Sequence, residues 1–400
     1  MKIQSPTRRR FISAAGTLPF LSLNSFSAET KTYRVGVIGH TGRGDFGHGM
    51  DTLWKEVPAT QVVAVSDPVE GGLAKALKKL GLQPESGFNS YQQLLDETHP
   101  DIVSVASRHT DQHHAMIMAA IKSGASGIYI EKPFCRDLVE ADEIVAACEA
   151  SGTKLAIAHR NRYHPVLPVV QKLVEDGAIG EWLEVRLRGK EDGRGGSQDL
   201  WVLGSHLLNL AHYFTGAPTS CAATVLQDKR RVTAADVVDG AEGLGPLAGN
   251  EVHARYETES GIPVFFDSIK EAGTREAGFG LQLIGTEGII DFRADRNPLV
   301  QIMKGSPFNP SKDARSWTPI STAGIGEPHP DPEASRFVMS HQAAALDLID
   351  SIENDGKPLC NEQDGRVVLE MILGVFESHR QGGKRVEIPL QNRTNALSRL

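Results

Sequence analysis

A carboxylate and an amine stand side by side in Glu131-Lys132-Pro133, directly after the apolar run Gly127-Ile128-Tyr129-Ile130. A glycine-rich turn, Gly39-His40-Thr41-Gly42-Arg43-Gly44, lies upstream and follows the strand-like run 33–38. Glycines in such a turn let a phosphate approach bare backbone N–H groups, and a strand can bring the charged pair to the same edge of a sheet. Together the two signals predict redox chemistry with a bound nucleotide.

Asp67 ends a second apolar run, 61–66, and its carboxylate can accept hydrogen bonds from both hydroxyls of an adenosine ribose. Pro68, Val69 and Glu70 follow it, so a 2′-phosphate would meet only negative charge. We therefore expect NAD rather than NADP as the cofactor. The alternative for Asp67 is a helix N-cap. The alternative for the glycines is a plain tight turn, because their spacing departs from G-x-G-x-x-G.

Residues 33–158 alternate apolar runs with helical segments, which is typical of a doubly wound parallel sheet. The predicted strands are 33–38, 61–66, 101–106, 128–130 and 154–158, and the predicted helices are 91–97, 113–123, 138–151 and one starting near 46–50. Ligands of such sheets bind at the carboxyl ends of the strands. Segments 107–110, 131–133 and 159–163 should therefore surround one crevice.

The second half of the chain has a different pattern, with short alternating or β-branched runs separated by turns. The predicted strands are 181–188, 222–226, 252–256, 262–269, 278–284, 288–292 and 385–389, and two late helices are predicted at 336–354 and 366–379. Such a series of hairpins predicts an α+β domain with an open, mostly antiparallel sheet.

From about Tyr33 to Leu390 the chain resembles the Gfo/Idh/MocA oxidoreductase family, on its glycine turn, its Glu-Lys-Pro segment and its two-part plan. The resemblance implies a Rossmann dinucleotide-binding domain over 32–158. It also implies an α+β substrate and oligomerisation domain over 159–390, whose closing helices pack on the first domain, and leaves 391–400 as a tail. The implied activity is hydride transfer to or from a sugar, polyol or glycoside, in a homo-oligomer formed through the open sheet.

In the family that this chain resembles, the Glu-Lys-Pro lysine lies beside the nicotinamide and the substrate hydroxyl, and a cis bond often precedes the proline. Lys132 inherits that position, and His206, which opens the apolar helix 207–214, matches the family's active-site histidine. Burial near a cationic nicotinamide would also lower the pKa of Lys132. The expected cofactor-binding residues are Gly39, Thr41, Gly42, Gly44, Asp67, Glu131 and Lys132, and the expected substrate-binding residues are His159, Arg162 and Tyr163. The alternatives are a surface ion pair for Glu131 and Lys132 and a structural role for His206.

The resemblance fails at one position of the expected site. The family's aspartate four residues before the histidine is Val202 here, and Asn209 stands where an aspartate is common one turn later. Valine cannot accept a proton or orient an imidazole. The groups that could supply a replacement are Asp199, Tyr163, His159, Glu191 and Asp192, and the sequence does not choose among them. The insert 232–249, with Asp236, Asp239 and Glu242, is expected to be a polar loop that influences specificity.

Thr7-Arg8-Arg9-Arg10-Phe11-Ile12 resembles a twin-arginine export signal, which would end near Ala28 and place the protein in the periplasm. The alternative is a basic disordered tail. Pro19, Asn24 and several serines make the segment too polar for a stable membrane span. Because an exported enzyme has no soluble NAD pool, we expect a tightly held, internally recycled cofactor. A redox-neutral glycoside hydrolase or lyase using NAD catalytically, and a non-catalytic dinucleotide- or sugar-binding protein, remain the alternatives.

The composition of the 400 residues excludes other classes of function. A net charge of −8 argues against nucleic acid as a partner. The four cysteines, Cys135, Cys148, Cys221 and Cys360, have no C-x-x-C spacing, so we expect no bound metal. A disulfide is possible in an oxidising compartment but nothing in the spacing supports one. Residues 392–400 are expected to be disordered.

Overall fold

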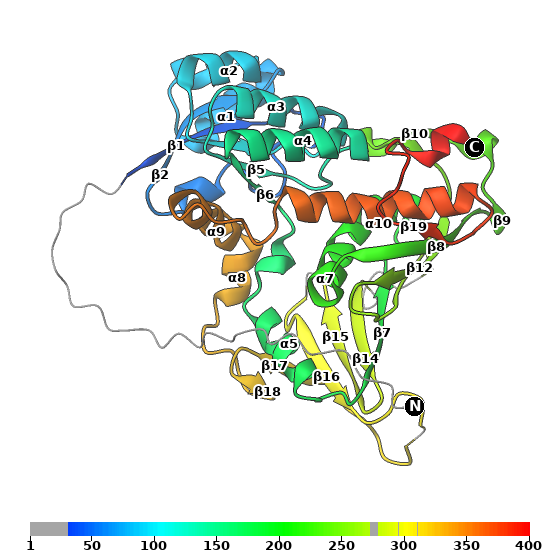
Figure 1. Cartoon of the computed structure of the whole chain (residues 1–400). Coiled ribbons are helices and arrows are strands. Elements are labelled where there is room, and N and C mark those ends of the chain that lie inside the picture. Colours follow the sequence, from blue (N-terminus) through cyan, green and yellow to red (C-terminus); the bar gives the residue numbers. More distant parts are fainter. Residues whose placement is uncertain (1–30, 273–278, 295, 310) are drawn as a thin grey trace, which may run out of the picture. The chain divides into compact units, whose positions relative to one another are not determined.

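Two sheets organise the protein in the computed structural model, which describes residues 31–272, 279–294, 296–309 and 311–400 (Figure 1). The proposed export signal, residues 1–28, lies outside the described residues. The first sheet is built from residues 33–157 and the second from residues 182–387. Among the described residues, no helix combines the length and the apolar character that crossing a bilayer requires.

The first sheet has six parallel strands in the order β3-β2-β1-β4-β5-β6. Its strands are β1 (Tyr33–Ile38), β2 (Thr60–Ser66), β3 (Gly87–Phe88), β4 (Ile102–Val105), β5 (Gly127–Ile130) and β6 (Lys154–Ile157). Its helices are α1 (Glu70–Leu80), α2 (Tyr91–Thr98), α3 (His113–Lys122) and α4 (Leu138–Ser151). All residues of β4 and β5 are buried, as expected for strands covered on both faces. The predicted doubly wound sheet is confirmed.

The prediction of a helix starting near 46–50 is wrong. Residues 41–52 form consecutive turns, followed only by the short 3-10 helix η1 (Leu53–Lys55). Gly42, Gly44, Gly47 and Gly49 have φ of 82°, 89°, 60° and 90°, and Asp45 has φ of 53°. Positive φ at these positions is incompatible with a right-handed helix. The glycine turn therefore leads into a looped connection to β2 and has no helix behind it.

The second sheet is mostly antiparallel, in the order β18-β17-β16-β15-β14-β7-β13-β12-β8-β19, and β9 also pairs with β8. The long strands are β7 (Trp182–Arg188), β8 (Pro218–Gln227), β12 (Glu251–Thr258), β13 (Val264–Ile269), β14 (Gly280–Gly285), β15 (Gly288–Arg293), β16 (Val300–Lys304) and β17 (Thr318–Ser321). The short ones are β9 (Arg230–Arg231), β18 (Gly324–Ile325) and β19 (Val386–Glu387). Only β7 and β13 pair in parallel within this sheet as described. The predicted α+β architecture is confirmed.

Three late helices connect the two sheets: α8 (Ala334–Met339), α9 (Gln342–Glu353) and α10 (Glu362–Arg380). The predicted single helix 336–354 is wrong, because His341 adopts a left-handed φ of 68° and divides it. The ring of His341 is buried and bonds the hydroxyl of Tyr129 in β5 over 2.6 Å, so this break is tied to the first sheet. Helix α9 packs on β5 and β6, and α10 packs on both α4 and β8.

The prediction that residues 392–400 are disordered is also wrong. Arg393 forms ion pairs with Asp142 of α4, over 2.7 Å, and with Glu370 of α10. Leu397, in the 3-10 helix η8 (Ala396–Arg399), is 2% exposed. These contacts depend on residues more than 20 positions away, which a local composition cannot reveal. All four cysteines are buried and free.

Candidate active site

Lys132 lies at the carboxyl end of β5, where the buried strand passes into the cis peptide bond Lys132–Pro133. Its side chain is 7% exposed, and its Nζ donates a hydrogen bond to the main-chain oxygen of Val202 over 2.8 Å. Burial lowers the pKa of Lys132, although the neighbouring Glu131 carboxylate opposes this effect. The alternative of a surface ion pair between these two residues is wrong, because Glu131 is only 1% exposed.

The helical segment that carries Val202 is irregular in a way that makes this contact possible. The chain runs from α6 (Ser197–Asp199) through a π-helical turn, η5 (Leu200–Gly204), into α7 (Ser205–Thr215). A π-turn widens the helix and interrupts the regular i→i−4 hydrogen bonds. A main-chain oxygen in such a turn can then accept a hydrogen bond from a side chain. The valine side chain cannot replace an aspartate, but its carbonyl provides the acceptor for Lys132.

His206 and His159 form a pair beside Lys132, with 3.1 Å between their Nδ1 atoms and with their rings edge to face. One Nδ1 must donate and the other must accept, so at least one ring is neutral. Burial and the charge of Lys132 lower the pKa of His159 to about 3 and hold the pKa of His206 well below its usual value. The structure therefore brings His206, His159 and Lys132 together, as the sequence predicted.

Glu131 faces the glycine turn. One carboxylate oxygen accepts the main-chain N–H of Lys132 over 2.9 Å, and the other lies 3.1 Å from Nδ1 of His48. Burial alone would raise the pKa of Glu131, but the hydrogen bond from His48 and the charge of Lys132 lower it to about 2. His48 belongs to no recognisable sequence motif. The turns formed by residues 41–52 bring it to Glu131.

Asp67 is fully buried and holds the glycine turn through Thr41. The Thr41 hydroxyl donates to Oδ2 of Asp67 over 2.6 Å, and the Thr41 N–H lies 3.1 and 3.2 Å from the two carboxylate oxygens. Oδ1 also accepts the N–H of Val69 over 2.9 Å. Helix α1 has Val69 at its N-cap, so the interpretation of Asp67 as an N-cap is wrong. The carboxylate instead fixes the turn at the end of β2.

Two arginines flank the glycine turn. Arg43 lies within it and pairs with Asp111 over 2.5 Å, while its Nε is buried without a partner. Arg108 follows β4 and packs closely on Gly44. A Cβ atom added at Gly44 would lie 2.6 Å from the main-chain nitrogen of Arg108. Its Nε is also buried without a partner. By contrast, a side chain added at Gly42 would meet no atom within 4 Å. Gly42 thus leaves open space in a turn that Arg43 and Arg108 flank.

Arg162 and Tyr163, which the sequence predicts as substrate-binding residues, are both buried. The guanidinium of Arg162 bonds the Asn209 oxygen over 2.9 Å and pairs with Asp364 over 3.2 Å, so α7 and α10 hold it in the interior. Tyr163 is 9% exposed, and its nearest titratable groups include Cys360 and Tyr129. Both follow His159 in the 3-10 helix η4 (Arg160–Tyr163), whose turn directs successive side chains apart.

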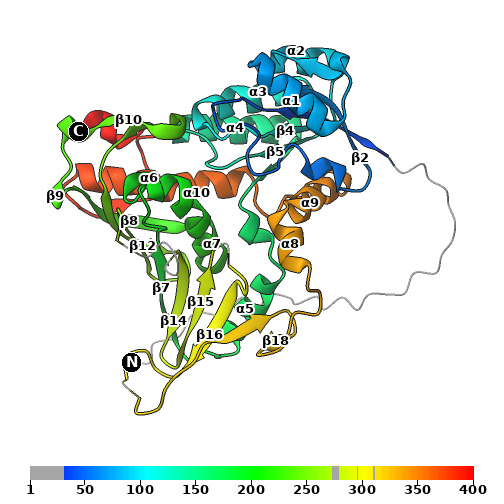
Figure 2. The ribbon, with the colours of Figure 1, turned by 180° about the vertical axis from the view of Figure 1, so that it is seen from behind.

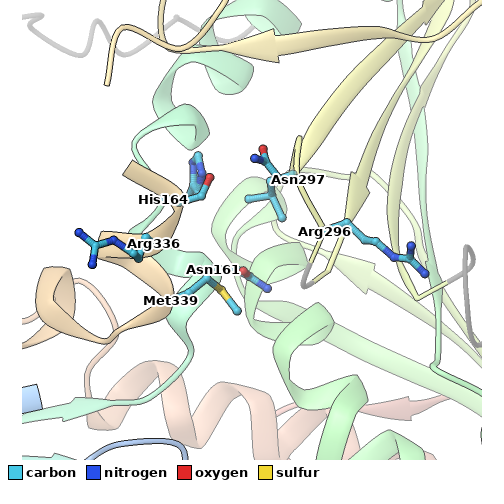
Figure 3. Close-up of a pocket in the computed structure, with 8 residues that line it drawn as sticks. Asn161, His164, Arg296, Asn297, Arg336 and Met339 are labelled. Atoms are coloured by element: carbon cyan, nitrogen blue, oxygen red, sulfur yellow. The ribbon is translucent and has the colours of Figure 1, made fainter. Parts of the chain in front are cut away.

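A cavity that the sequence did not reveal is lined by residues from three segments of the chain. It has a volume of about 180 Å³ and lies between η4, the turn that connects β15 to β16, and α8 (Figure 3). The lining residues are Asn161, His164, Arg296, Asn297, Leu299, Ser335, Arg336 and Met339. Figure 3 shows His164 and Asn297 on opposite sides of this space. Asn161 stands two residues after His159 in the sequence, and His159 itself does not line the cavity.

Comparisons with known proteins agree with this geometry. Residues 33–159 match the NAD-binding Rossmann fold of an oxidoreductase family, and residues 171–388 match the C-terminal alpha/beta domain of the same family. D-apiose dehydrogenase of Paraburkholderia graminis is 25% identical over 89% of this chain and 91% of the relative. The NAD(+)-dependent scyllo-inositol 2-dehydrogenase of Bacillus subtilis is 22% identical over 87% and 94%. A levoglucosan dehydrogenase solved with NADH and L-sorbose has a TM-score of 0.71 at 19% identity, over 90% of this chain and 99% of that one.

We predict that the neutral state of His159 makes the protein less stable in acid. Its pKa is lowered in the folded protein, so the unfolded chain binds an additional proton below about pH 6.5, and stability falls as the pH decreases towards about 3. Between pH 6.5 and 5, one such proton corresponds to about 2 kcal/mol. The free energy of unfolding is measured in urea at these two pH values. The difference between the two values should be smaller in His159→Gln than in the wild type by about that amount. An equal difference in both proteins would show that His159 is charged when folded.

Proposed function

The chain belongs to the Gfo/Idh/MocA family of NAD-dependent oxidoreductases, and from this we propose that it oxidises a CH–OH group of a sugar, polyol or glycoside to a carbonyl, or reduces that carbonyl back to CH–OH. The observation that carries the proposal is the buried Lys132, placed at the end of β5 beside the His159–His206 pair. NAD would supply the hydride acceptor for the carbinol carbon. The named relatives act on D-apiose, levoglucosan and scyllo-inositol, which all carry several hydroxyl groups.

Lys132 is the group that we assign to the hydroxyl proton. Its lowered pKa increases the fraction of neutral amine near pH 8, and the Val202 carbonyl fixes its position. His206 is a weaker base, because burial and the charge of Lys132 disfavour its imidazolium form. A neutral His206 can instead hold the substrate hydroxyl by a hydrogen bond, with His159 fixing its tautomer.

The same site provides groups for the cofactor. Asp67 would accept ribose hydroxyls in place of the hydroxyl of Thr41, which it binds now. The helix whose N-terminus usually faces the diphosphate is absent after β1, so Arg43 and Arg108 would provide the positive charge instead. Gly39, Gly42 and Gly44 allow the close approach of the backbone. Pro68, Val69 and Glu70 follow Asp67, with no Arg or Lys to meet a 2′-phosphate, which favours NAD over NADP.

The cavity lined by Asn161 and His164, which follow His159 in the chain, would bind substrate hydroxyls. Asn161, His164 and Asn297 provide donors and acceptors there, and both amides can bond a hydroxyl in either direction. We therefore propose this cavity as the region that receives the part of the substrate remote from the reacting carbon.

We also propose a homo-oligomer through the open face of the second sheet. That face carries the charged side chains of Arg186, His253, Arg255 and Asp267 around Phe265. The guanidinium carbon of Arg186 lies 4.1 Å from the centroid of the Phe265 ring, so the two side chains form a cation–π contact. The mass of the protein in solution, measured by light scattering, tests this proposal, and a monomer at micromolar concentration contradicts it.

We predict that Lys132→Met abolishes turnover without loss of the cofactor. Removal of a proton-transfer group costs a factor of about 10² to 10⁴ in kcat. Levoglucosan, scyllo-inositol and D-apiose are the substrates to screen, with NADH formation followed by absorbance. Lys154→Met, on the neighbouring strand β6, is the matched control and should retain activity. If the Lys132 variant keeps its activity, this assignment is wrong; if the wild type binds no NAD, the oxidoreductase proposal itself fails.

Arg108→Ala should weaken NADH binding by a factor of about ten to one hundred, since it removes a charge-assisted bond to phosphate. Fluorescence titration measures the dissociation constant, and the variant should also show a shallower dependence on salt. Lys304→Ala is the control, because it removes the same charge from the exposed end of β16, in the second sheet. Equal affinities for wild type and Arg108→Ala would mean that the diphosphate does not contact this arginine.

Export by the twin-arginine route, with a cofactor that is retained and recycled within the enzyme, is a further part of the proposal. Its support is the sequence Thr7-Arg8-Arg9-Arg10-Phe11-Ile12. We predict that protein purified from the periplasm releases about one equivalent of NAD when it is heat-denatured, as measured by chromatography. Protein that is exported without nucleotide, and that needs added NAD for every turnover, would contradict the recycling proposal.

A further inference from the structure

The insert at residues 232–249 forms a small arm that reaches the first sheet. It contains the 3-10 helix η6 (Ala234–Asp236), then β10 (Val238–Gly240), η7 (Ala241–Gly243) and β11 (Gly245–Leu247). Strands β10 and β11 pair as a hairpin with η7 at its tip. Figures 1 and 2 both show β10 beside the end of α4 and close to the C-terminus. The arm thus joins the two halves of the protein at the crevice.

The tip of the arm is held by the loop that follows β4. The Thr110 hydroxyl lies 3.2 Å from the main-chain oxygen of Glu242 and 3.0 Å from that of Gly243. A side chain at Gly243 would come within 2.3 Å of the Asp111 carboxylate, so the two segments are in close contact. Thr110 itself is fully buried. These contacts give the tip a defined position next to Arg108 and His109.

Glu242 occupies the tip in a left-handed conformation, with φ of 59° and ψ of 24°. Residues other than glycine rarely adopt this conformation, and they keep it mainly where the surroundings require it, often at functional sites. The two bonds from Thr110 hold the main chain at this point. The main chain at Glu242 therefore has a defined position at the tip.

The carboxylate of Glu242 lies among cations of the proposed site. Its charge raises the pKa of Lys132, opposing the effect of burial, and it acts in the same direction on His109 and Arg194. Within the part of the chain that the structure describes, no hydrogen bond or ion pair is formed by this carboxylate. The tip that carries Glu242 is bonded to the loop after β4, and β4 pairs in parallel with β5, at whose end Lys132 lies. Glu242 therefore stands at the same edge of the first sheet as Lys132, and its carboxylate can accept a bond from a ligand there.

Three other carboxylates near the site have partners within the protein, although Oδ1 of Asp199 is buried and has none. Asp199 accepts a hydrogen bond from Ser268 over 2.6 Å, Glu191 pairs with Arg188 over 2.8 Å, and Asp192 pairs with Arg194. Glu191 also accepts the N–H of Ile269 over 2.8 Å. These interactions make them poor candidates for the role that Val202 cannot fill.

We propose that Glu242 is a substrate-binding carboxylate that accepts hydrogen bonds from hydroxyls next to the reacting carbon, in the place that Val202 leaves without an acid. The inference rests on the proposed function, because it assumes a polyhydroxylated substrate at Lys132. A carboxylate can accept two hydroxyl hydrogens at once, which selects vicinal diols over isolated alcohols. It would thereby assign part of the specificity to the arm.

Glu242→Gln tests the proposal, because the amide keeps the size of the side chain and removes its charge. With the substrate identified in the screen above, KM should rise at least tenfold, while the dissociation constant for NADH stays within twofold. Asp239→Asn, on the exposed β10 of the same arm, is the control and should leave KM within twofold. Glu242→Asp keeps the charge on a shorter chain and should give an intermediate KM.

A second readout needs no substrate. Loss of the negative charge should lower the pKa of Lys132, so acetic anhydride at pH 8 should label Lys132 faster in Glu242→Gln than in the wild type or in Asp239→Asn. The labelled peptide is quantified by mass spectrometry. An unchanged KM in an active enzyme overturns the inference. A wild type without activity on any sugar contradicts the proposed function instead, and equal labelling rates would then show that Glu242 does not face Lys132.

Discussion

The hydrogen bond from Lys132 to the Val202 carbonyl is the contact on which the arrangement of the site depends. It joins the end of β5 to the π-helical turn before α7, and so links the two sheets through a buried cation. A buried ammonium needs acceptors, because its desolvation is costly. The main-chain oxygen of Val202 meets this need, although its side chain carries no acid.

A consequence of this link is that the electrostatics of the site are dominated by positive charge and burial. Lys132 holds His159 and His206 in their neutral forms, while the same lysine and His48 keep Glu131 ionised. The protonation state of each of these groups is thus set by burial and by its charged neighbours. Neutral imidazoles beside a lysine of lowered pKa form a set that can accept a hydroxyl proton without a carboxylate in direct contact.

The cofactor side follows the same principle of replacement. The turns after β1 remove the helix that would normally face a diphosphate, and they place Arg43 and Arg108 at the glycine turn instead. The insert brings the tip of its arm to the neighbouring loop after β4. Two departures from the usual pattern, at Val202 and at the insert, thus contact residues that follow strands β5 and β4.

The sequence by itself predicted both sheets and the position of Lys132 at the end of β5, because apolar periodicity is a local signal. The pairing of His206 with Lys132 came from the resemblance to the family. It failed where a side chain's direction or a backbone φ depends on distant partners. Arg162 turns inward to Asp364, and His341 breaks a helix where its ring meets Tyr129. Only the tertiary structure decided which main-chain oxygen binds the lysine, because a residue's letter does not record which of its backbone groups lacks a partner.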